Sequence, residues 1–454
     1  MAARQASAAM VDVASVEELR AAGHAVVTAG HYRVLLVAHD GRIVGLDNRC
    51  PHMGFPLDRG TVADGTLTCH WHHARFDLAG GCTFDPWADD ALAFLVEVRG
   101  GRVFVGTEPV PRDWRTHRLR KLREGLGHNL RLVIAKSVIG LDEVVPSSEI
   151  VAEAALFGIR HRSGGWSSGL SILTSMANVA AYLAPSDRSR ALYHGAVQVA
   201  RSTAGQPPSF DLAPLQTAEA TPERYLDWFR RFVEVRSSSA AERTLRTGIR
   251  VGLPPRAVAD MVFTACTDHR FLDAGHTLDF ANKAFELLDH IGWRYAEEVL
   301  PSLVPQLVAA RRMEETSAWR HPVDLPALLD DLYAELDALL DSAPRREAWD
   351  GHRELAETIL VAEPPEILDA MRELLRVGVT LGALAAAVAY AASRRPVHFP
   401  ASNEHADWDT VHHAFTYANA VDQAIRRAPS RLVARGILDA ALAVYLERFL
   451  NVPK

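Results

Sequence analysis

Residues 50 to 81 read CPHMGFPLDRGTVADGTLTCHWHHARFDLAGG, and this stretch decides the fold of the amino-terminal part of the chain. It contains two pairs of metal-binding residue types, Cys50-x-His52 and Cys69-x-x-His72. Each pair lies where neighbouring residues indicate a tight turn between strands. Thiolates suit a ferric iron, and neutral imidazoles suit the iron that takes up an electron. Two such pairs on neighbouring turns can therefore converge on one metal centre.

The sequence around these pairs predicts a small all-β fold. Turn residues such as Asp40-Gly41 and Gly100-Gly101 punctuate the chain, which is typical of antiparallel strands joined by tight turns. Ser15 and Glu18 have the spacing of a capping box and predict one helical turn. The apolar runs that predict strands are YRVLLV (32–37), RIVGL (42–46), FLVEV (94–98) and RVFV (102–105).

The stretch from about residue 10 to residue 107 resembles the Rieske [2Fe-2S] family, whose two ligand loops have this sequence pattern. The resemblance implies that Cys50 and Cys69 hold one iron and that His52 and His72 hold the other. It also implies a [2Fe-2S] cluster as the cofactor and an electron-donating reductase or ferredoxin as the partner. A zinc site made of the same two cysteines and two histidines is the structural alternative.

Two residues depart from the common family pattern, since His70 replaces the usual proline and His73 replaces the usual glycine. High-potential members of the family add one cysteine to each loop and join the two by a disulfide. This chain has Phe55 and Trp71 at those positions. It is therefore similar to the ferredoxin and oxygenase branch, with an expected reduction potential on the order of -150 mV.

The composition is that of a globular chain that is too long for one core. Its 454 residues predict two to four domains, and 48% hydrophobic residues exclude wholesale disorder. A net charge of -7 argues against nucleic-acid binding. No basic and apolar leader is visible, and the apolar stretch at 378–393 is too short for a bilayer span, so we expect a cytoplasmic protein without a membrane partner. We expect Cys82 and Cys266 to be buried thiols, because four cysteines make no disulfide scaffold in a chain of this size.

The pattern changes at about residue 126, where helical periodicity begins and strand signals become scarce. We predict a multidomain α+β chain: a small all-β Rieske domain at 1–108, a basic linker at 109–125 and a large all-α domain at 126–454. A solvated connector is the simplest interpretation of the linker, and docking of an anionic partner is the alternative. The α/β iron domain of ring-hydroxylating oxygenases is not expected, because its His-x-x-x-x-His spacing is missing among the 20 histidines.

Segments of the helical part resemble one another. RVGLPPRAVADMVFTA (250–265) matches RVGVTLGALAAAVAYA (376–391), and each is followed by a histidine-containing turn and a helix with an Ala-Asn pair, at 281–282 and 418–419. A weaker third copy has its pair at 177–178. Helical repeats bury their apolar faces against one another, so we predict a solenoid-like or bundled domain with internal repeats.

The spacing His-x3-Asp-x2-His occurs before two of these helices. On a helix it places three side chains on one face, which suits a non-haem iron, although Gly275 interrupts the first copy. Two facing helices with such residues resemble carboxylate-bridged di-metal bundles. Helix capping and polar core networks are the alternative, and His413 is among the histidines that could complete a metal site. The candidate ligands are His269, Asp273, His276, His405, Asp409 and His412.

The stretch DHRFLDAGHTLDFANKAFELL (268–288) is similar to questin-oxidase-like proteins, a histidine-rich helical oxygenase family. Those enzymes insert oxygen into polycyclic aromatic rings at a non-haem iron held by histidines and, in some members, by a carboxylated lysine. The resemblance implies Lys283 as a candidate ligand beside His276, and it implies an organic substrate and O2 as reactants.

These observations predict an iron-sulfur oxidoreductase. Its cluster would take single electrons from a reductase or ferredoxin and pass them to a non-haem iron oxygenase site in the helical domain. An electron carrier whose helical domain is a docking platform for a catalytic partner is the alternative. A redox sensor has no positive support in the sequence.

Overall fold

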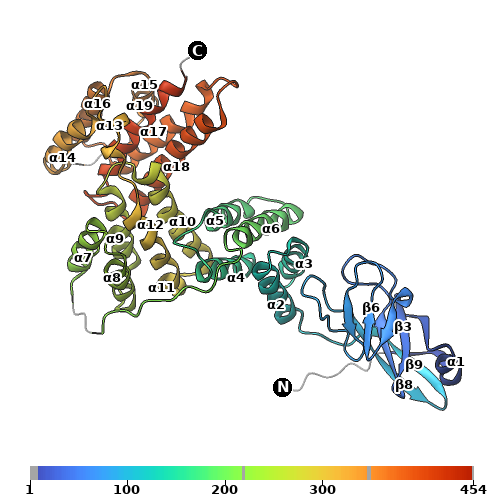
Figure 1. Ribbon diagram of the computed structural model, residues 1–454. Coiled ribbons are helices and arrows are strands. Elements are labelled where there is room, and N and C mark those ends of the chain that lie inside the picture. The colour runs from blue at the N-terminus through green and yellow to red at the C-terminus, as the bar shows by residue number, and fades with distance from the viewer. Residues whose placement is uncertain (1–8, 217–219, 345–348, 452–454) are drawn as a thin grey trace. The chain divides into compact units, whose positions relative to one another are not determined.

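A computed structural model describes residues 9–216, 220–344 and 349–451 (Figure 1). The first eight residues of the predicted domain at 1–108 lie outside this part. The chain divides into two compact units, and the division does not follow sequence order. One unit contains Met1–Ala154 and Leu183–Gly205, and the other contains the rest of the chain. The predicted boundaries at 108 and 125 stay predictions.

The amino-terminal part forms two antiparallel sheets, as the alternating runs and turns predict. The larger sheet has the strand order β1-β9-β8-β4-β3-β2, and the smaller has the order β5-β6-β7. The short helix α1 begins where predicted, because Ser15 accepts a hydrogen bond from the backbone of Glu18 at 3.1 Å. The strands are β1 (Met10–Ser15), β2 (His24–Ala29), β3 (Tyr32–His39), β4 (Arg42–Asp47), β5 (Thr61–Ala63), β6 (Thr66–Thr68), β7 (Arg75–Asp77), β8 (Ala93–Arg99) and β9 (Arg102–Pro109).

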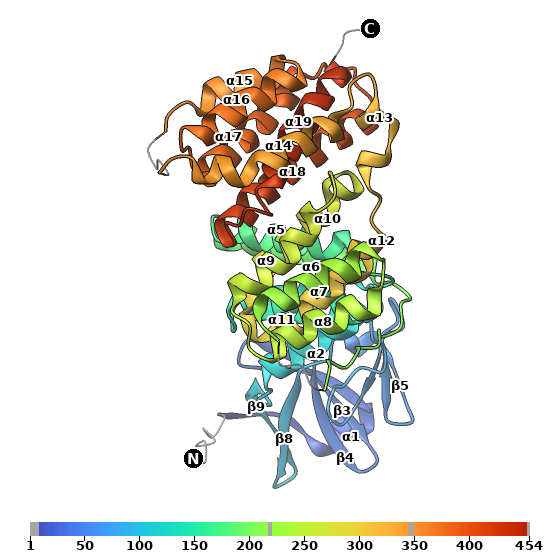
Figure 2. The ribbon, with the colours of Figure 1, turned by 90° about the vertical axis from the view of Figure 1, so that its left-hand side faces the viewer.

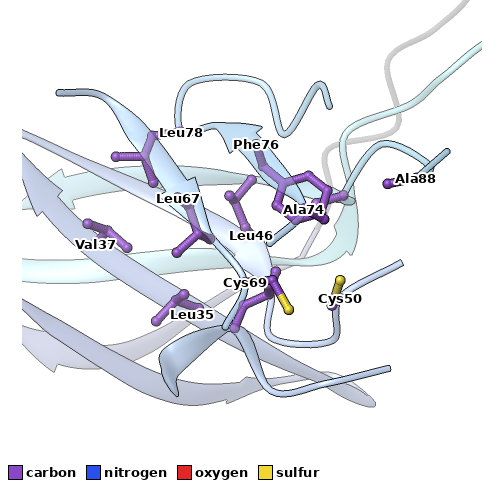
Figure 3. Close-up of a cluster of buried hydrophobic side chains, with 12 residues drawn as sticks. Leu35, Val37, Leu46, Cys50, Leu67, Cys69, Ala74, Phe76, Leu78 and Ala88 are labelled. Atoms are coloured by element: carbon purple, nitrogen blue, oxygen red, sulfur yellow. The ribbon is translucent and has the colours of Figure 1, made fainter. Parts of the chain in front are cut away.

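The core that positions the candidate site draws residues from both sheets. Leu35 and Leu46 come from the larger sheet, and Leu67 and Phe76 come from the smaller one. The two loop cysteines belong to the same buried cluster, and Figure 3 shows their sulfur atoms next to each other at its edge. Burial of this apolar surface therefore fixes the strand ends from which both loops start.

After β9 the described chain is helical, which confirms the predicted fold class. The apolar stretch at 378–393 forms α17, a largely buried helix that Thr380 caps through a hydrogen bond from the backbone of Ala383. Figure 2 shows α15, α16, α17 and α19 packed side by side. No helix in the described part is long and apolar enough to cross a membrane. The helices are α1 (Val16–Ala22), α2 (Trp114–Gly127), α3 (Arg131–Asp142), α4 (Ser147–Arg160), α5 (Ser168–Ala180), α6 (Pro185–Ser202), α7 (Pro222–Glu234), α8 (Ser238–Arg250), α9 (Pro255–Thr267), α10 (His276–Ile291), α11 (Ala296–Val299), α12 (Val304–Ala309), α13 (Ser317–Arg320), α14 (Leu325–Asp341), α15 (His352–Val361), α16 (Pro364–Arg376), α17 (Leu381–Arg394), α18 (His405–Arg427) and α19 (Arg435–Leu446).

The cation-rich segment after β9 is ordered rather than a free connector. It forms α2, whose His117 lies 2.8 Å from Asp89 and whose Lys121 donates to the carbonyl of Ala88 at 3.1 Å. Arg118 forms a further ion pair with Asp89. The helix is thus attached to the loop between β7 and β8, and its charges have partners within the first unit.

The two matching segments of the helical part form equivalent structures. Residues 250–265 end α8 and form most of α9, and residues 376–391 end α16 and form most of α17. The two Ala-Asn pairs that follow lie on α10 and α18, which pack against each other. The internal repeat itself stays a prediction.

Candidate functional site

The two candidate ligand loops have the same backbone geometry. In the first loop the N–H of Cys50 donates to Phe55, and in the second the N–H of Cys69 donates to Ala74, both at 2.8 Å. In each loop the residue four positions after the cysteine donates back to the cysteine carbonyl, and this residue has a positive φ. It is Gly54 in the first loop, with φ of 88°, and His73 in the second, with φ of 62°. The left-handed geometry at His73 explains why glycine is the more common residue there.

The side chains of the four candidate ligands come together at this end of the β fold. Cys50 is 3% exposed and Cys69 is 1% exposed, and both are free thiols. The imidazole rings of His52 and His72 lie 4.8 Å apart between centroids. Nδ1 of His52 is buried and has no hydrogen-bond partner in the described part. An unpartnered buried nitrogen beside two buried thiols fits a bound metal cluster.

Burial shapes the protonation of the metal-free loops. It raises the pKa of Cys50 to about 11, and the neighbouring Cys69 contributes to the increase. Burial, together with the charge of His72, lowers the pKa of His52. The imidazole is therefore neutral near pH 7, whereas iron has to displace the thiol proton to bind. His72 is exposed to solvent, whereas His52 is half-buried. The ring of Trp87 contacts the ring of His52 edge-on, with 4.9 Å between the ring centroids.

The sequence of this part of the chain matches known proteins. The family model of the Rieske [2Fe-2S] domain matches residues 9–96. The ferredoxin component of the alkene monooxygenase system of Xanthobacter autotrophicus is 38% identical over 104 residues, which are 23% of this chain and 85% of that protein. The chain belongs to the Rieske [2Fe-2S] family. A Rieske domain holds a [2Fe-2S] cluster, so the zinc alternative gives way to the cluster.

Other similar proteins share only this domain. Aminopyrrolnitrin oxygenase of Pseudomonas fluorescens is 36% identical over 75 residues, which are 16% of this chain and 17% of that protein. The solved ferredoxin of carbazole 1,9a-dioxygenase from Nocardioides aromaticivorans is 24% identical, with a TM-score of 0.21, and the match covers 22% of this chain and 98% of that chain. The Rieske relatives thus include both ferredoxin components and oxygenases.

One contact of the first loop could not be found from the Rieske motif. Nζ of Lys136 donates to the carbonyl oxygens of Pro51 and His52, at 2.5 and 2.6 Å. Lys136 lies on α3, beyond the residues that match the family model. The motif is local in sequence, whereas this contact depends on how α3 packs within the first unit.

The first copy of the spacing His-x3-Asp-x2-His is not helical, so the prediction that it lies on one helix face is wrong. The helix α10 begins only at His276, and Asp273 and Ala274 have positive φ angles of 53° and 56°. His269 lies before this turn, between Glu314 at 2.8 Å and Glu234 at 2.7 Å. Both of its ring nitrogens are therefore engaged by carboxylates.

The second copy lies on the single helix α18, but its residues do not meet those of the first. The ring that faces His276 is His413, at 4.1 Å between centroids, and Asp409 lies 3.7 Å from His413. His405 and His412 are exposed. Among residues 9–216, 220–344 and 349–451, no group of three or more His, Cys, Asp or Glu residues is arranged to hold one metal ion. The six predicted residues are therefore not brought together.

Lys283 takes part in a buried polar network on α10. Its Nζ lies 2.8 Å from Glu286, which also accepts hydrogen bonds from Asn178 and Asn282, both at 2.7 Å. These asparagines belong to two of the Ala-Asn pairs in the predicted repeat. Burial raises the pKa of the nearby Asp279 to about 6, although Lys283 opposes this increase. These hydrogen bonds form a polar core network, which is the alternative to a metal site that the sequence left open.

The two remaining cysteines differ in exposure. Cys266 is buried, as predicted, and burial raises the pKa of its thiol well above the usual value. Cys82 is exposed, so the prediction of a buried thiol is wrong at that position. It lies between β7 and β8, and its carbonyl accepts a hydrogen bond from the backbone N–H of Asp77 at 2.8 Å.

We expect the stability of the helical unit to depend on the charge of His269. Burial alone would lower the pKa of His269, but the hydrogen bonds to Glu314 and Glu234 outweigh it and raise the pKa. A raised folded-state pKa stabilises the fold below the unfolded value of about 6.5, and this stability is lost as pH rises through the folded value. Replacing His269 with Gln should therefore lower the free energy of unfolding more at pH 6 than at pH 9. Urea titrations at both pH values test this, with His352→Gln as the control, and an equal loss at both values would contradict it.

Proposed function

We propose that this Rieske protein is an iron-sulfur oxidoreductase of the oxygenase type. Cys50, His52, Cys69 and His72 would hold a [2Fe-2S] cluster, which would supply single electrons from a reductase or ferredoxin for a reaction of O2 with an organic substrate in the helical part. The observation that carries the proposal is the pairing of two buried thiols with two adjacent imidazoles on loops of matching geometry. The similar proteins, which include a ferredoxin component and an oxygenase, support the proposal.

In this proposal Cys50 and Cys69 bind one iron, and His52 and His72 bind the other. The bound cluster supplies a one-electron redox couple. The buried cysteines keep water from their iron, which favours an intact cluster. The exposed ring of His72 lies where a redox partner can reach it, whereas His52 is half-covered by Trp87. We therefore assign His72 as the ligand through which electrons enter or leave.

An apolar cavity in the second unit supports the proposal that the substrate is an organic molecule. Its volume of about 570 Å³ lies within the range of small-molecule sites. Thr410 also lines it, one turn before His413 on α18. The cavity therefore reaches α18, the helix that carries His413. Its larger apolar lining residues are Phe271, Trp319, Leu325, Tyr445 and Phe449.

A separate iron site in the helical part, in addition to the two irons of the cluster, is tested by metal analysis of the reconstituted, gently desalted protein. We expect a third iron per chain that is lost in His276→Ala and in His413→Ala, because two facing imidazoles are typical iron ligands. His352→Ala, on α15, is the matched control and should retain it. Iron that stops at two per chain, unchanged by either substitution, would remove the second site.

The electron-carrier alternative rests on two observations. The alkene monooxygenase relative is a ferredoxin component that aligns over 85% of its own length, and the described residues gather no three-ligand metal group in the helical part. Turnover separates the two functions. The purified chain supplied with a reductase, O2 and an aromatic substrate should form product by itself if it is an oxygenase. Product that forms only after a further protein is added would favour the carrier.

A further inference from the structure

A lysine from outside the Rieske domain holds the first ligand loop. Nζ of Lys136 donates to the carbonyl oxygens of Pro51 and His52, which are 85 and 84 residues away in sequence. These carbonyls belong to the short segment that begins at Cys50 and ends at His52. The lysine therefore fixes the backbone that presents one thiol and one imidazole.

The helix that carries Lys136 is itself anchored. At its end, Asp142 lies 3.2 Å from Nε of Arg188 and accepts a hydrogen bond from Ser189 at 2.7 Å, both on α6. The helix α3 also packs against α2, which is tied to the loop between β7 and β8. The side chain of Lys136 is half-buried. It is thus held in place within the first unit, unlike a mobile surface lysine.

The charge of Lys136 is not neutralised by a direct partner. Among the described residues it forms no ion pair, since both of its hydrogen bonds go to backbone carbonyls. Burial lowers the pKa of Lys136, and the acid that most opposes this decrease is Asp89, which already pairs with His117 and Arg118. A positive charge therefore remains beside the first ligand loop.

Such a charge acts on the redox couple. Reduction adds one negative charge to a [2Fe-2S] cluster, and the net charge and hydrogen bonds around the cluster set its potential. A fixed cation nearby interacts more favourably with the reduced form than with the oxidised form. A lysine in this position therefore favours reduction.

We infer that Lys136 is a positioning residue of the Rieske cluster, which holds the Cys50–His52 segment in place and raises the reduction potential. The inference rests on the proposed ligand assignment. It also means that the functional Rieske module of this chain extends beyond the matched residues 9–96 to include α3.

The test is an anaerobic redox titration of the full chain, followed by low-temperature EPR, for Lys136→Met, Lys136→Gln and Lys136→Arg. We expect Met and Gln to lower the equilibrium constant for reduction about tenfold, which makes the midpoint about 59 mV more negative. Arg retains the charge and should restore most of the native value. The control Arg190→Gln removes an exposed cation of α6 that pairs only with Asp187 of the same helix in the described part, and it should leave the midpoint unchanged.

The outcomes separate this inference from the proposed function. A Lys136→Gln protein with a full EPR signal and the native midpoint would overturn the inference while leaving the cluster in place. A wild-type protein without any signal would instead overturn the proposed function. If Met and Gln both fail to load a cluster that Lys136→Arg and Arg190→Gln load, the positioning role is supported. Equal loss in Arg190→Gln would contradict it.

Discussion

Replacing Cys69 with Ser is expected to remove the visible absorption of the protein and its EPR signal after reduction. The side chain is 1% exposed in the core and lies in the same buried cluster as Cys50, so its loss leaves the site with one of its two thiols. A serine hydroxyl is a poor ligand for iron compared with a thiolate. The iron content should fall by two atoms per chain, because the cluster is lost. Electron transfer from any donor should be lost completely.

The matched control is Cys82→Ser, because Cys82 is exposed and lies outside both ligand loops. It should retain the full spectrum and the full iron content of the cluster. Absorption and iron are measured on the anaerobically reconstituted proteins side by side. A Cys69→Ser protein with the native spectrum, or a Cys82→Ser protein without it, would contradict the ligand assignment.

Replacing Phe76 with Ala is expected to destabilise the β fold by about 3–5 kcal/mol, because it leaves a cavity in a core that cannot collapse fully. Phe76 is 0% exposed, lies on β7 opposite Leu67 of β6 and belongs to the cluster that contains Cys50 and Cys69. Its loss should therefore weaken the support of both ligand loops.

Urea denaturation followed through the cluster absorbance reports on the β fold alone and measures this effect. Val62→Ala on the exposed strand β5 is the control and should change the free energy of unfolding by less than about 0.5 kcal/mol. Equal midpoints for Phe76→Ala and Val62→Ala would show that the core does not support the loops in the way described.

The Rieske loops could be predicted because their structure is local. The backbone hydrogen bonds within each loop join residues at most five positions apart, such as Cys50 and Phe55 or Cys69 and Ala74. The residues that the geometry needs therefore stand next to one another in the sequence. The alternating strands that support the loops are equally local patterns.

The helical part was harder to predict, since its polar contacts join distant segments. His276 meets His413 through the packing of α10 on α18, and no spacing in the sequence marks that pair. Gly275 signals the break before α10, but Asp273 and Ala274 also have positive φ angles, which their residue types do not indicate. Lys136 was missed for the same reason, because only tertiary packing brings α3 to the first loop.

We propose that Cys50, His52, Cys69 and His72 hold the Rieske cluster. The most direct test is a redox titration of the wild-type protein, followed by low-temperature EPR together with iron and sulfide analysis. We expect a one-electron couple at the lower end of the Rieske range, on the order of -150 mV, with two irons in the cluster. A protein that stays EPR-silent after reduction, or a cluster with a potential near about -400 mV as in plant-type ferredoxins, would contradict it.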